Sequence, residues 1–326
     1  MKLMMACASH SPLLLFPAHE TEVVKAIWAS LHAERRRIEE FNPDLVIIFG
    51  ADHYGGHQMV SMPAFCVGVE ATALADVGGT PGRLRVPKEV AVRAVDALRR
   101  DNIDVAVSYS MDVDHGFSQV LQLLTGGIDV YEVLPIFVSC IQPPFVPFHR
   151  ARALGAAVGR YAVSLPYERI LFVGTGGIAH NPISVFPPID HVPQEWRPYH
   201  LFGKRQTGVS QQSWIDYQIA AHHQGALIIA EESMPLEAVG INSKWDREFM
   251  DIFCSGDLST FDSWEPDDVV AAAGIGAMET LSWIAAGQAI QTATSARPRS
   301  LFLEGCREVG VGFGVAEAGP APALAV

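Results

Sequence analysis

Histidines recur in one kind of place along this sequence, shortly after apolar runs that predict β-strands. Four segments show this pattern, and they carry His10, His53, His115 and His180. In open α/β sheets the ligand crevice lies outside the carboxyl ends of the strands, so parallel strands would bring these imidazoles to one edge. A single histidine after a strand is usually an exposed or satisfied polar group. Four in equivalent positions, within turns rich in glycine, aspartate and proline, indicate a functional site.

A carboxylate in apolar surroundings is the second unusual feature. Glu279 is the one charged residue in the stretch Val269–Ala296. On a helix, its neighbours one turn away include Ile275 and Trp283, so its face is apolar. A buried carboxylate is costly unless it is paired, which leaves a structural ion pair, an N–H acceptor or a metal ligand as its role. Two imidazoles and one carboxylate with open positions form the facial triad of non-haem Fe(II) oxygenases.

Apolar runs and helical patterns alternate along the chain, which predicts an α/β fold, a single domain with a mostly parallel central sheet flanked by helices. The expected strands are Leu3–Ala8, Leu45–Phe49, Phe65–Val69, Val105–Tyr109, Val133–Val138 and Ile170–Val173. The expected helices are Glu20–Glu40, Lys88–Arg100, Phe117–Leu124, Phe148–Ser164, Ser213–Glu231, Lys244–Cys254 and Asp267–Ile290. We expect a catalytic domain over 1–314, a proline-rich lid or insertion at 182–210, and a mobile tail at 315–326.

Composition excludes several classes of protein. Of the 326 residues, 49% are hydrophobic and 18% are charged, which rules out a disordered chain. The net charge of -13 disfavours a nucleic-acid partner. Five cysteines without a C-x-x-C pair indicate no disulfide framework and fit a cytoplasmic location. His10, Ser11 and Pro12 interrupt the apolar start before it reaches signal-peptide length, and Glu279 disfavours a membrane-spanning helix.

Six segments together resemble the class III extradiol ring-cleavage dioxygenases, the family of the protocatechuate 4,5-dioxygenase catalytic subunit. They are SHSPL around His10, PDLVIIFGADHYGG around His53, AVSYSMDVDHGFSQ around His115, RILFVGTGGIAHNP around His180, NSKWDREFM near Trp245 and AMETLSWIAA around Glu279. The segments occur in family order and cover most of residues 1–290. The segment 182–210 and the residues after Arg297 match little.

The resemblance implies a metal site for Fe(II) made of His10, His53 and Glu279. It implies His180 as the base that deprotonates the catechol and His115 as the acid that assists ring expansion, with Asp114 orienting or tuning His115. Histidine suits both roles because its unperturbed pKa is about 6.5. The implied substrates are O2 and 2,3-dihydroxyphenylpropionate or a related 3-substituted catechol. Both oxygen atoms would enter a hydroxymuconic-semialdehyde-type product of aromatic catabolism, and the enzyme would be a homo-oligomer.

Two other hypotheses stay open. A zinc-dependent hydrolase could use the same triad, because histidine and glutamate also bind zinc. A non-catalytic homologue could bind phenols, although it would need neither an acid nor a base. The loop Gly174–Gly177 does not fit a nucleotide-binding loop, because Asn181 and Pro182 follow before a helix can begin. The other eight histidines are interpreted as structural or solvated.

Overall fold

The structure is a computed structural model in which residues 1–17, 19–182, 186–203, 208, 210–229, 236, 240–322 and 324 are described. The strands are β1 (Lys2–Ala8), β2 (Leu45–Gly50), β3 (Phe65–Gly68), β4 (Ala71–Ala73), β5 (Gly82–Arg83), β6 (Ala106–Ser108), β7 (Met111–Val113), β8 (Glu132–Val138), β9 (Arg169–Thr175), β10 (Arg299–Cys306) and β11 (Val311–Pro322). The α-helices are α1 (Glu22–Phe41), α2 (Lys88–Arg100), α3 (His115–Thr125), α4 (Phe148–Val163), α5 (Arg197–Phe202), α6 (Gln211–Ile229), α7 (Ser243–Ser255), α8 (Pro266–Ala273) and α9 (Thr280–Thr294). Three 3-10 helices also matter for the site: η1 (Pro12–Leu15), η8 (Ile275–Glu279) and η9 (Arg307–Val309).

The central sheet has the strand order β10-β11-β1-β9-β2-β8-β3-β6. Its middle strands β1, β9, β2 and β8 are parallel, whereas β11 and β10 add antiparallel pairs at one edge and β3 is antiparallel to β8. The single α/β domain is confirmed, but the sheet is mixed rather than mostly parallel. The difference arises largely after Arg297, where two strands follow each other without a helix between them. A second, small sheet of order β5-β4-β7 continues from the edge of the central one, because β4 closely follows β3 and β7 closely follows β6.

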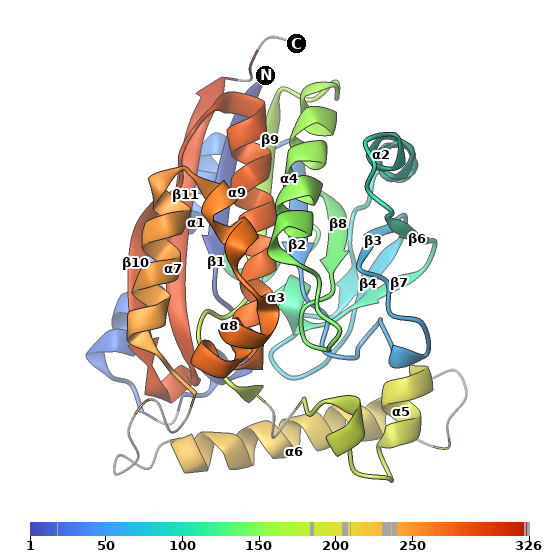
Figure 1. Cartoon of the computed structure of the whole chain (residues 1–326), viewed down its shortest axis with the longest axis vertical. Helices are drawn as coiled ribbons and strands as arrows, with labels where there is room; N and C mark the ends of the chain where they lie inside the picture. The colour runs from blue at the N-terminus through green and yellow to red at the C-terminus, as the bar shows by residue number, and fades with distance from the viewer. Residues whose placement is uncertain are drawn as a thin grey trace.

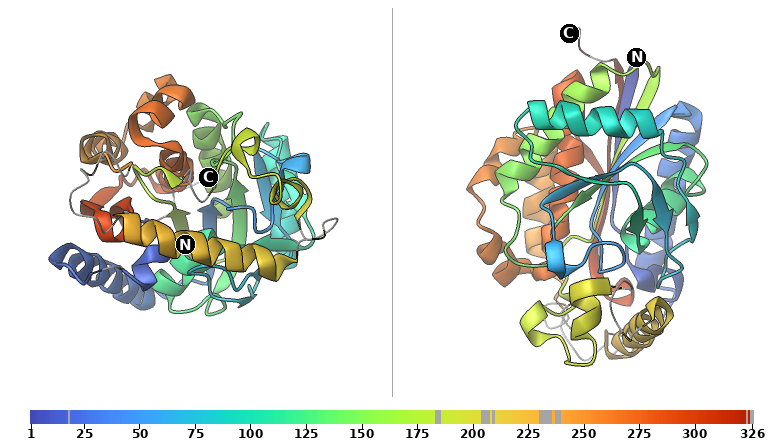
Figure 2. Two further views of the ribbon diagram at one scale, coloured as in Figure 1. Left: turned by 90° about the horizontal axis from the view of Figure 1, so that it is seen from below. Right: turned by 90° about the vertical axis from the view of Figure 1, so that its right-hand side faces the viewer.

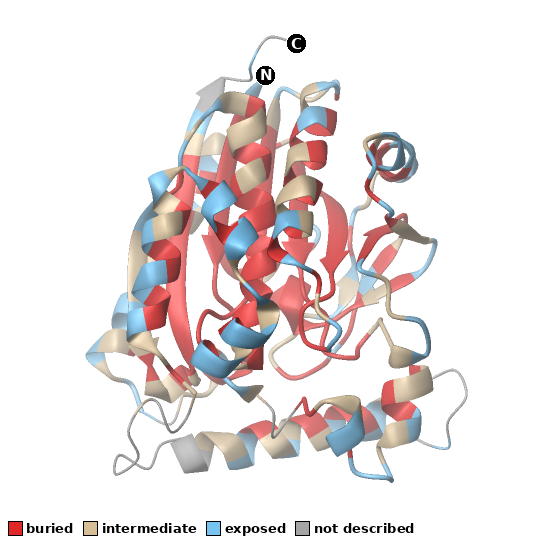
Figure 3. Cartoon of the chain, viewed as in Figure 1, coloured by how far each residue is buried: buried red, intermediate tan, exposed pale blue. Residues whose placement is uncertain are grey.

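Helices cover both faces of the central sheet (Figures 1 and 2). Successive residues of β1 point to opposite faces, as in any strand. Met5 and Cys7 belong to the core under α4 and α9, and Met4 and Ala6 to the core under α1 and α3. Because both of its faces are covered, β1 is an uninterrupted apolar run. Figure 3 shows the buried residues concentrated in the sheet and on the inner sides of these helices.

The helix expected over Asp267–Ile290 is interrupted, and α8, η8 and α9 follow one another instead. Gly274 has a φ of 82°, and a Cβ there would lie 2.3 Å from the carbonyl oxygen of His180, so glycine is required. The N–H of Gly276 donates to that carbonyl over 3.1 Å. Glu279 therefore ends η8 beside the His180 loop and does not lie on the face of a continuous helix. None of the described helices combines the length and the apolarity needed to cross a membrane.

The expectation of a mobile tail over 315–326 is wrong for its residues up to 322. These residues belong to β11, which pairs with β1. Within β11, Glu317 is buried and forms ion pairs with Arg37 and Arg299. The alanine, glycine and proline of this segment are typical of a linker, but pairing with a distant strand orders it. Residues 323, 325 and 326 lie outside the described residues.

The described part of the proline-rich segment 182–210 lies with α6 at the carboxyl ends of the parallel strands (Figure 1). Its described part includes a 3-10 turn at Ile189–His191 and helix α5. Helix α6 contacts η1, which directly follows β1, and η9, which precedes β11. Residues 183–185, 204–207 and 209 lie outside the described part, and the expected lid function stays a prediction.

Candidate metal centre and active site

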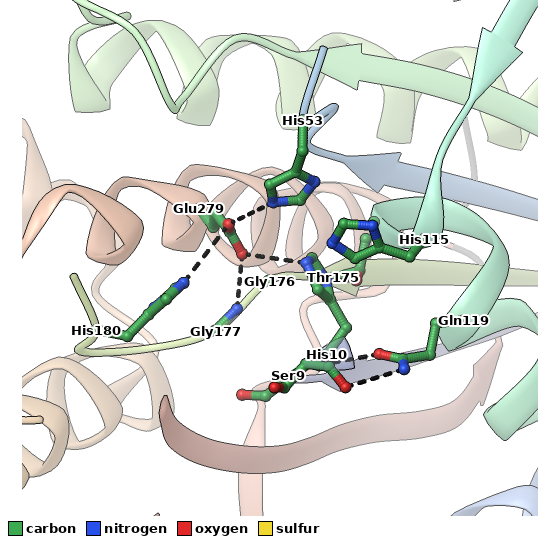
Figure 4. A network of polar contacts seen from close by, with 12 residues as sticks. Ser9, His10, His53, His115, Gln119, Thr175, Gly176, Gly177, His180 and Glu279 are labelled. Atoms are coloured by element: carbon green, nitrogen blue, oxygen red, sulfur yellow. Dashed lines mark hydrogen bonds and ion pairs between the residues drawn. The ribbon is translucent and has the colours of Figure 1, made fainter. Parts of the chain in front are cut away.

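The structure brings the four predicted histidines and Glu279 together at the carboxyl ends of the parallel strands (Figure 4). His10, His53 and His180 follow β1, β2 and β9, as expected. His115 is the first residue of α3 and follows β7 of the small sheet, not β6. All five residues are at most 8% exposed. The site is therefore a buried cluster of titratable groups, which is costly to build unless the groups are paired or bind a ligand.

Two imidazole nitrogens converge on the carboxylate of Glu279. Nε2 of His53 lies 3.1 Å from Oε1, and Nε2 of His10 lies 3.6 Å from Oε2. The N–H of Gly177 donates to Oε2 over 2.8 Å. Burial raises the pKa of Glu279, but His10 and the hydrogen bond with His53 outweigh burial and lower this pKa to about 2. Glu279 is therefore an ionised carboxylate at neutral pH.

The opposite nitrogen of each of these two rings is held by a second group. Nδ1 of His10 lies 2.8 Å from Oγ1 of Thr175, and Nδ1 of His53 lies 3.4 Å from Oδ1 of Asp114. Metal-binding histidines typically have this arrangement, in which the outer partner fixes the ring and leaves the other nitrogen for the metal. The residues present therefore fit a metal ion held by Nε2 of both histidines and by Glu279.

The protonation of the two rings also bears on metal binding. Burial lowers the pKa of His10 to about 3, so this ring is neutral, as a metal ligand must be. Burial acts in the same direction on His53, but the charge of Asp114 outweighs it and raises the pKa of His53 well above its usual value. A cation bound at Nε2 of His53 would displace that proton, so metal binding would release it.

Asp76 holds His115, and the sequence did not indicate this contact. Oδ2 of Asp76 lies 2.5 Å from Nδ1 of His115 and accepts the backbone N–H of the same residue over 3.1 Å. Nε2 of His115 is buried and has no hydrogen-bond partner among the described residues. Burial, and then the neighbouring charge of His53, lower the pKa of His115 to about 3. A neutral His115 with an unpaired Nε2 is suited to exchange a proton with a bound molecule.

Asp114, which we expected to orient or tune His115, instead contacts His53. Its carboxylate accepts the backbone N–H of His53 and lies beside Nδ1 of that ring. It also caps α3 by accepting the N–H of Gly116 over 2.9 Å. The rings of His53 and His115 stack with centroids 4.4 Å apart. Asp114 thus orients His53 rather than the ring of His115, but its charge raises the pKa of His115 against the effect of burial. Its role in tuning His115 stays a prediction.

Geometry alone also offers a second set of metal ligands. Nitrogens of His10, His53 and His115 lie within 4.8 Å of one another, as do ligand atoms of Asp76, Asp114 and His115. His115 is common to both groups, but its Nδ1 is already engaged by Asp76. Iron retention in His115→Gln and in Glu279→Gln distinguishes Glu279 from His115 as the third ligand.

The ring of His180 packs closely against Gly177 and Gly276 at the edge of the cluster. A Cβ at Gly276 would lie 2.3 Å from its ring, and a Cβ at Gly177 would lie 2.5 Å away. Nδ1 of His180 lies 3.0 Å from the carbonyl oxygen of Ile178, so an N–H there donates to that carbonyl. In the neutral ring Nε2 then carries the lone pair, and it lies 3.8 Å from Oε1 of Glu279. His180 thus presents a proton acceptor beside the cluster.

A cavity opens onto these imidazoles. It is lined by His10, Ser11, Pro12, Leu13, His53, His115, His180, Asn181, Pro182, Phe186, His222, Gly225, Val309, Gly310 and Val311. His222 was interpreted as structural or solvated, because nothing in the sequence places α6 over the site. Asp76 was also missed, although an isolated acid in the apolar run before Gly78 was a usable signal.

Fold and site together define a metal-binding α/β enzyme, and comparison with known proteins identifies the family. A family profile described as the catalytic LigB subunit of aromatic ring-opening dioxygenase matches residues 4–314. The chain therefore belongs to the LigB family of ring-opening dioxygenases, which confirms the resemblance found in the six segments.

Several proteins that are similar in sequence to this chain are named for the same activity. A relative from Rhodococcus sp, named 2,3-dihydroxyphenylpropionate/2,3-dihydroxicinnamic acid 1,2-dioxygenase, is 38% identical over 313 residues, which cover 96% of this chain and 97% of the relative. Relatives with the same activity in their names are 38% identical in Pseudomonas putida (87% and 88% covered) and 36% identical in Dechloromonas aromatica (90% and 90% covered).

Proposed function

We propose that this chain catalyses Fe(II)-dependent extradiol cleavage of a 3-substituted catechol, with iron held by His10, His53 and Glu279. The observation that supports this most strongly is the convergence of two Nε2 atoms on the ionised Glu279, with each Nδ1 engaged by another group. Two nitrogens and one carboxylate are the ligand set of non-haem Fe(II) oxygenases. Zinc accepts the same ligands, but the dioxygenase names of the relatives favour iron.

The relatives' names and the cavity support a catechol that carries a short acidic side chain. The relatives are named for 2,3-dihydroxyphenylpropionate and 2,3-dihydroxicinnamic acid. Side chains of Leu13, Phe186, Val309 and Val311 give the cavity apolar walls, which suit an aromatic ring and a short aliphatic chain. We propose 2,3-dihydroxyphenylpropionate or a close analogue as the substrate, with a hydroxymuconic-semialdehyde-type product.

Proton transfer to His180 is the first step assigned to the chain's own residues. Iron bound at this site would supply electron transfer between the diol and O2. Because Nδ1 of His180 is engaged by the carbonyl of Ile178, its Nε2 is the atom that would take a proton from a catechol hydroxyl. Gly177 and Gly276 leave room for the ring, and the hydrogen bond to Ile178 orients it, so the base is positioned before substrate binds.

Proton donation by His115 is the second step. Burial and the charge of Asp114 raise the pKa of Asp76 well above its usual value, which favours a protonated carboxyl that donates to Nδ1 of His115. The proton of the neutral imidazole then lies on Nε2, the nitrogen that lacks a partner among the described residues. From there it would be given to a substrate oxygen as the ring opens.

Metal replacement tests the proposal. Protein prepared anaerobically without metal would be loaded with Fe(II) or Zn(II) and given 2,3-dihydroxyphenylpropionate and O2. We expect O2 consumption and a yellow ring-fission product with Fe(II) and neither with Zn(II). A zinc-loaded protein that hydrolyses esters or amides would support the hydrolase instead. Tight catechol binding without O2 consumption under Fe(II) would support the non-catalytic homologue.

Assembly as a homo-oligomer and a cytoplasmic location stay predictions. The resemblance to the dioxygenase family supports the first, and the five cysteines, none of which is in a disulfide, support the second. Sedimentation of the purified protein would test the homo-oligomer, and fractionation of the source cells would test the location.

A further inference from the structure

One imidazole in the cavity wall has no part in the reaction proposed above. His222 lies on α6, is 7% exposed and lines the cavity. Its Nδ1 lies 2.7 Å from the carbonyl oxygen of Gln218, one turn earlier, so an N–H there donates to that carbonyl. Among the residues that the structure describes, none forms a hydrogen bond with its Nε2. Because the ring lines the cavity and no described residue engages Nε2, that nitrogen is available to a ligand.

His222 lies in the cavity wall beside His115 and Phe186. Its ring centroid is 6.4 Å from that of His115 and 5.7 Å from that of Phe186. A catechol whose hydroxyls lie at the histidine and glutamate cluster would therefore direct a substituent toward α6. Apolar side chains of Leu13 and Val311 belong to the same cavity, so an aliphatic chain would lie against them.

We propose that Nε2 of His222 binds the carboxylate at the end of the substrate's side chain and thereby determines specificity for acidic catechols. The inference rests on the proposed function and names the group that selects its substrate. Among the described residues that line the cavity there is no lysine or arginine. The other four imidazoles are assigned to metal binding or proton transfer, so among the described lining residues His222 is the one left that can become a cation.

Binding of an acid is expected to protonate His222. In the empty cavity, burial lowers its pKa to about 3, and the neighbouring His115, His53 and His223 act in the same direction, while the hydrogen bond to Gln218 opposes them. A carboxylate next to Nε2 favours the imidazolium. The complex would then contain a charge-assisted hydrogen bond in place of an unpaired buried carboxylate, which would be costly.

Two substrates, and variants of His222 and of His223, separate this role from a structural one. 2,3-Dihydroxyphenylpropionate and 3-propylcatechol have side chains of equal length, and only the first carries a carboxylate. His222→Gln should raise the KM for the acid by about 10- to 100-fold, the loss typical of a charge-assisted hydrogen bond, and should change the KM for 3-propylcatechol far less. His223→Gln is the matched control, because its exposed ring stacks on Phe16 outside the cavity lining. His222→Phe keeps a ring in the wall and is the second variant should His222→Gln fail to fold.

Calorimetry gives a readout that does not depend on turnover. Anaerobic binding of each catechol to the Fe(II) protein, measured in two buffers of different ionisation enthalpy, counts the protons taken up. Binding of the acid to the wild type should be accompanied by uptake of about one proton more than binding of 3-propylcatechol. This difference in proton uptake should vanish in His222→Gln. The inference would be overturned if His222→Gln raised the KM for both substrates equally. It would also be overturned if the preference for the acid survived in His222→Gln. If the wild type cleaves neither catechol, the proposed function is wrong, and proton uptake alone decides the role of His222.

Discussion

Nε2 of His53 and Oε1 of Glu279 lie 3.1 Å apart although 226 positions separate the two residues in the chain. The first follows a central parallel strand, and the second ends a 3-10 helix that exists because Gly274 breaks the preceding helix. The contact therefore depends on both the strand order and that break. Neither His53 nor Glu279 would define a metal site alone.

Glu279→Gln should remove the metal and the activity while the protein stays folded. The amide keeps the shape of the side chain but loses the charge needed to hold a divalent cation. Metal content by elemental analysis and ellipticity by circular dichroism would be measured together. Glu304→Gln is the control, because Glu304 is an exposed glutamate on β10. Full iron content and full turnover in Glu279→Gln would exclude Glu279 as a ligand.

His115→Gln and His180→Gln should both retain iron and lose about 10²–10⁴-fold in rate, the usual cost of losing a proton-transfer group. Anaerobic spectra of bound catechol would separate them. His180→Gln should slow formation of the deprotonated catechol, whereas His115→Gln should permit this step and block ring opening. The reverse pattern would exchange the two roles. Loss of iron in His115→Gln with retention in Glu279→Gln would establish the three-imidazole centre instead.

Asp76→Asn should reduce kcat and leave iron content and the KM of the catechol nearly unchanged. Asp76 contacts Nδ1 of His115 and lies outside the cavity lining, so its loss should affect proton donation rather than binding. An asparagine can still hold the ring but cannot pass on a proton. We expect the variant to accumulate deprotonated substrate, as His115→Gln should. Wild-type kcat, or a raised KM alone, would show that Asp76 has no part in this step.

Phe186 should limit which ring substituents fit. Trp196 and Tyr199 belong to the insertion 182–210, but their rings stack on Tyr217 and Trp214, and neither lines the cavity. Phe186 comes from the same insertion, and its ring centroid lies 4.8 Å from that of His53.

Phe186→Ala is expected to shift relative kcat/KM toward bulkier 3-substituted catechols without changing iron content. Tyr109→Ala, at an exposed aromatic residue, is the control. An unchanged order of substrates in Phe186→Ala would count against a lid function of the insertion.

Asp246→Asn should flatten the dependence of stability on pH. Burial raises the pKa of Asp246 to about 7 in spite of the hydrogen bond from the N–H of Ala179. The folded state thus binds this proton more tightly than the unfolded state, where the pKa is about 3.9. The wild type's free energy of unfolding therefore falls as pH rises from about 4 to 7. Urea unfolding at several pH values should show a smaller fall in Asp246→Asn. Asp251→Asn, exposed on the same helix, should behave as the wild type.

Local patterns predicted the central part of the fold and most of the site. The apolar runs that form β1, β2 and β9 are visible in the sequence, and so are the histidines after them. The break at Gly274 was not predicted. Glycine is required at this position because the carbonyl oxygen of His180 lies against it, and this contact arises only in the folded chain. Pairing of β11 with β1 and the position of His222 over the cavity likewise depend on long-range packing. The contact between Asp76 and His115 joins two loops whose proximity no local pattern encodes.

The pairing of β11 with β1 has a consequence for how the enzyme is made. β1 leads directly to His10, yet one of its two neighbours in the sheet consists of residues 311–322. During synthesis on the ribosome, the pairing of β1 is therefore complete only after residues 311–322 have emerged. Glu279 is also made long after His10 and His53. The three proposed ligands can thus come together only after residue 279 has emerged, so a metal held by all of them is bound after that point.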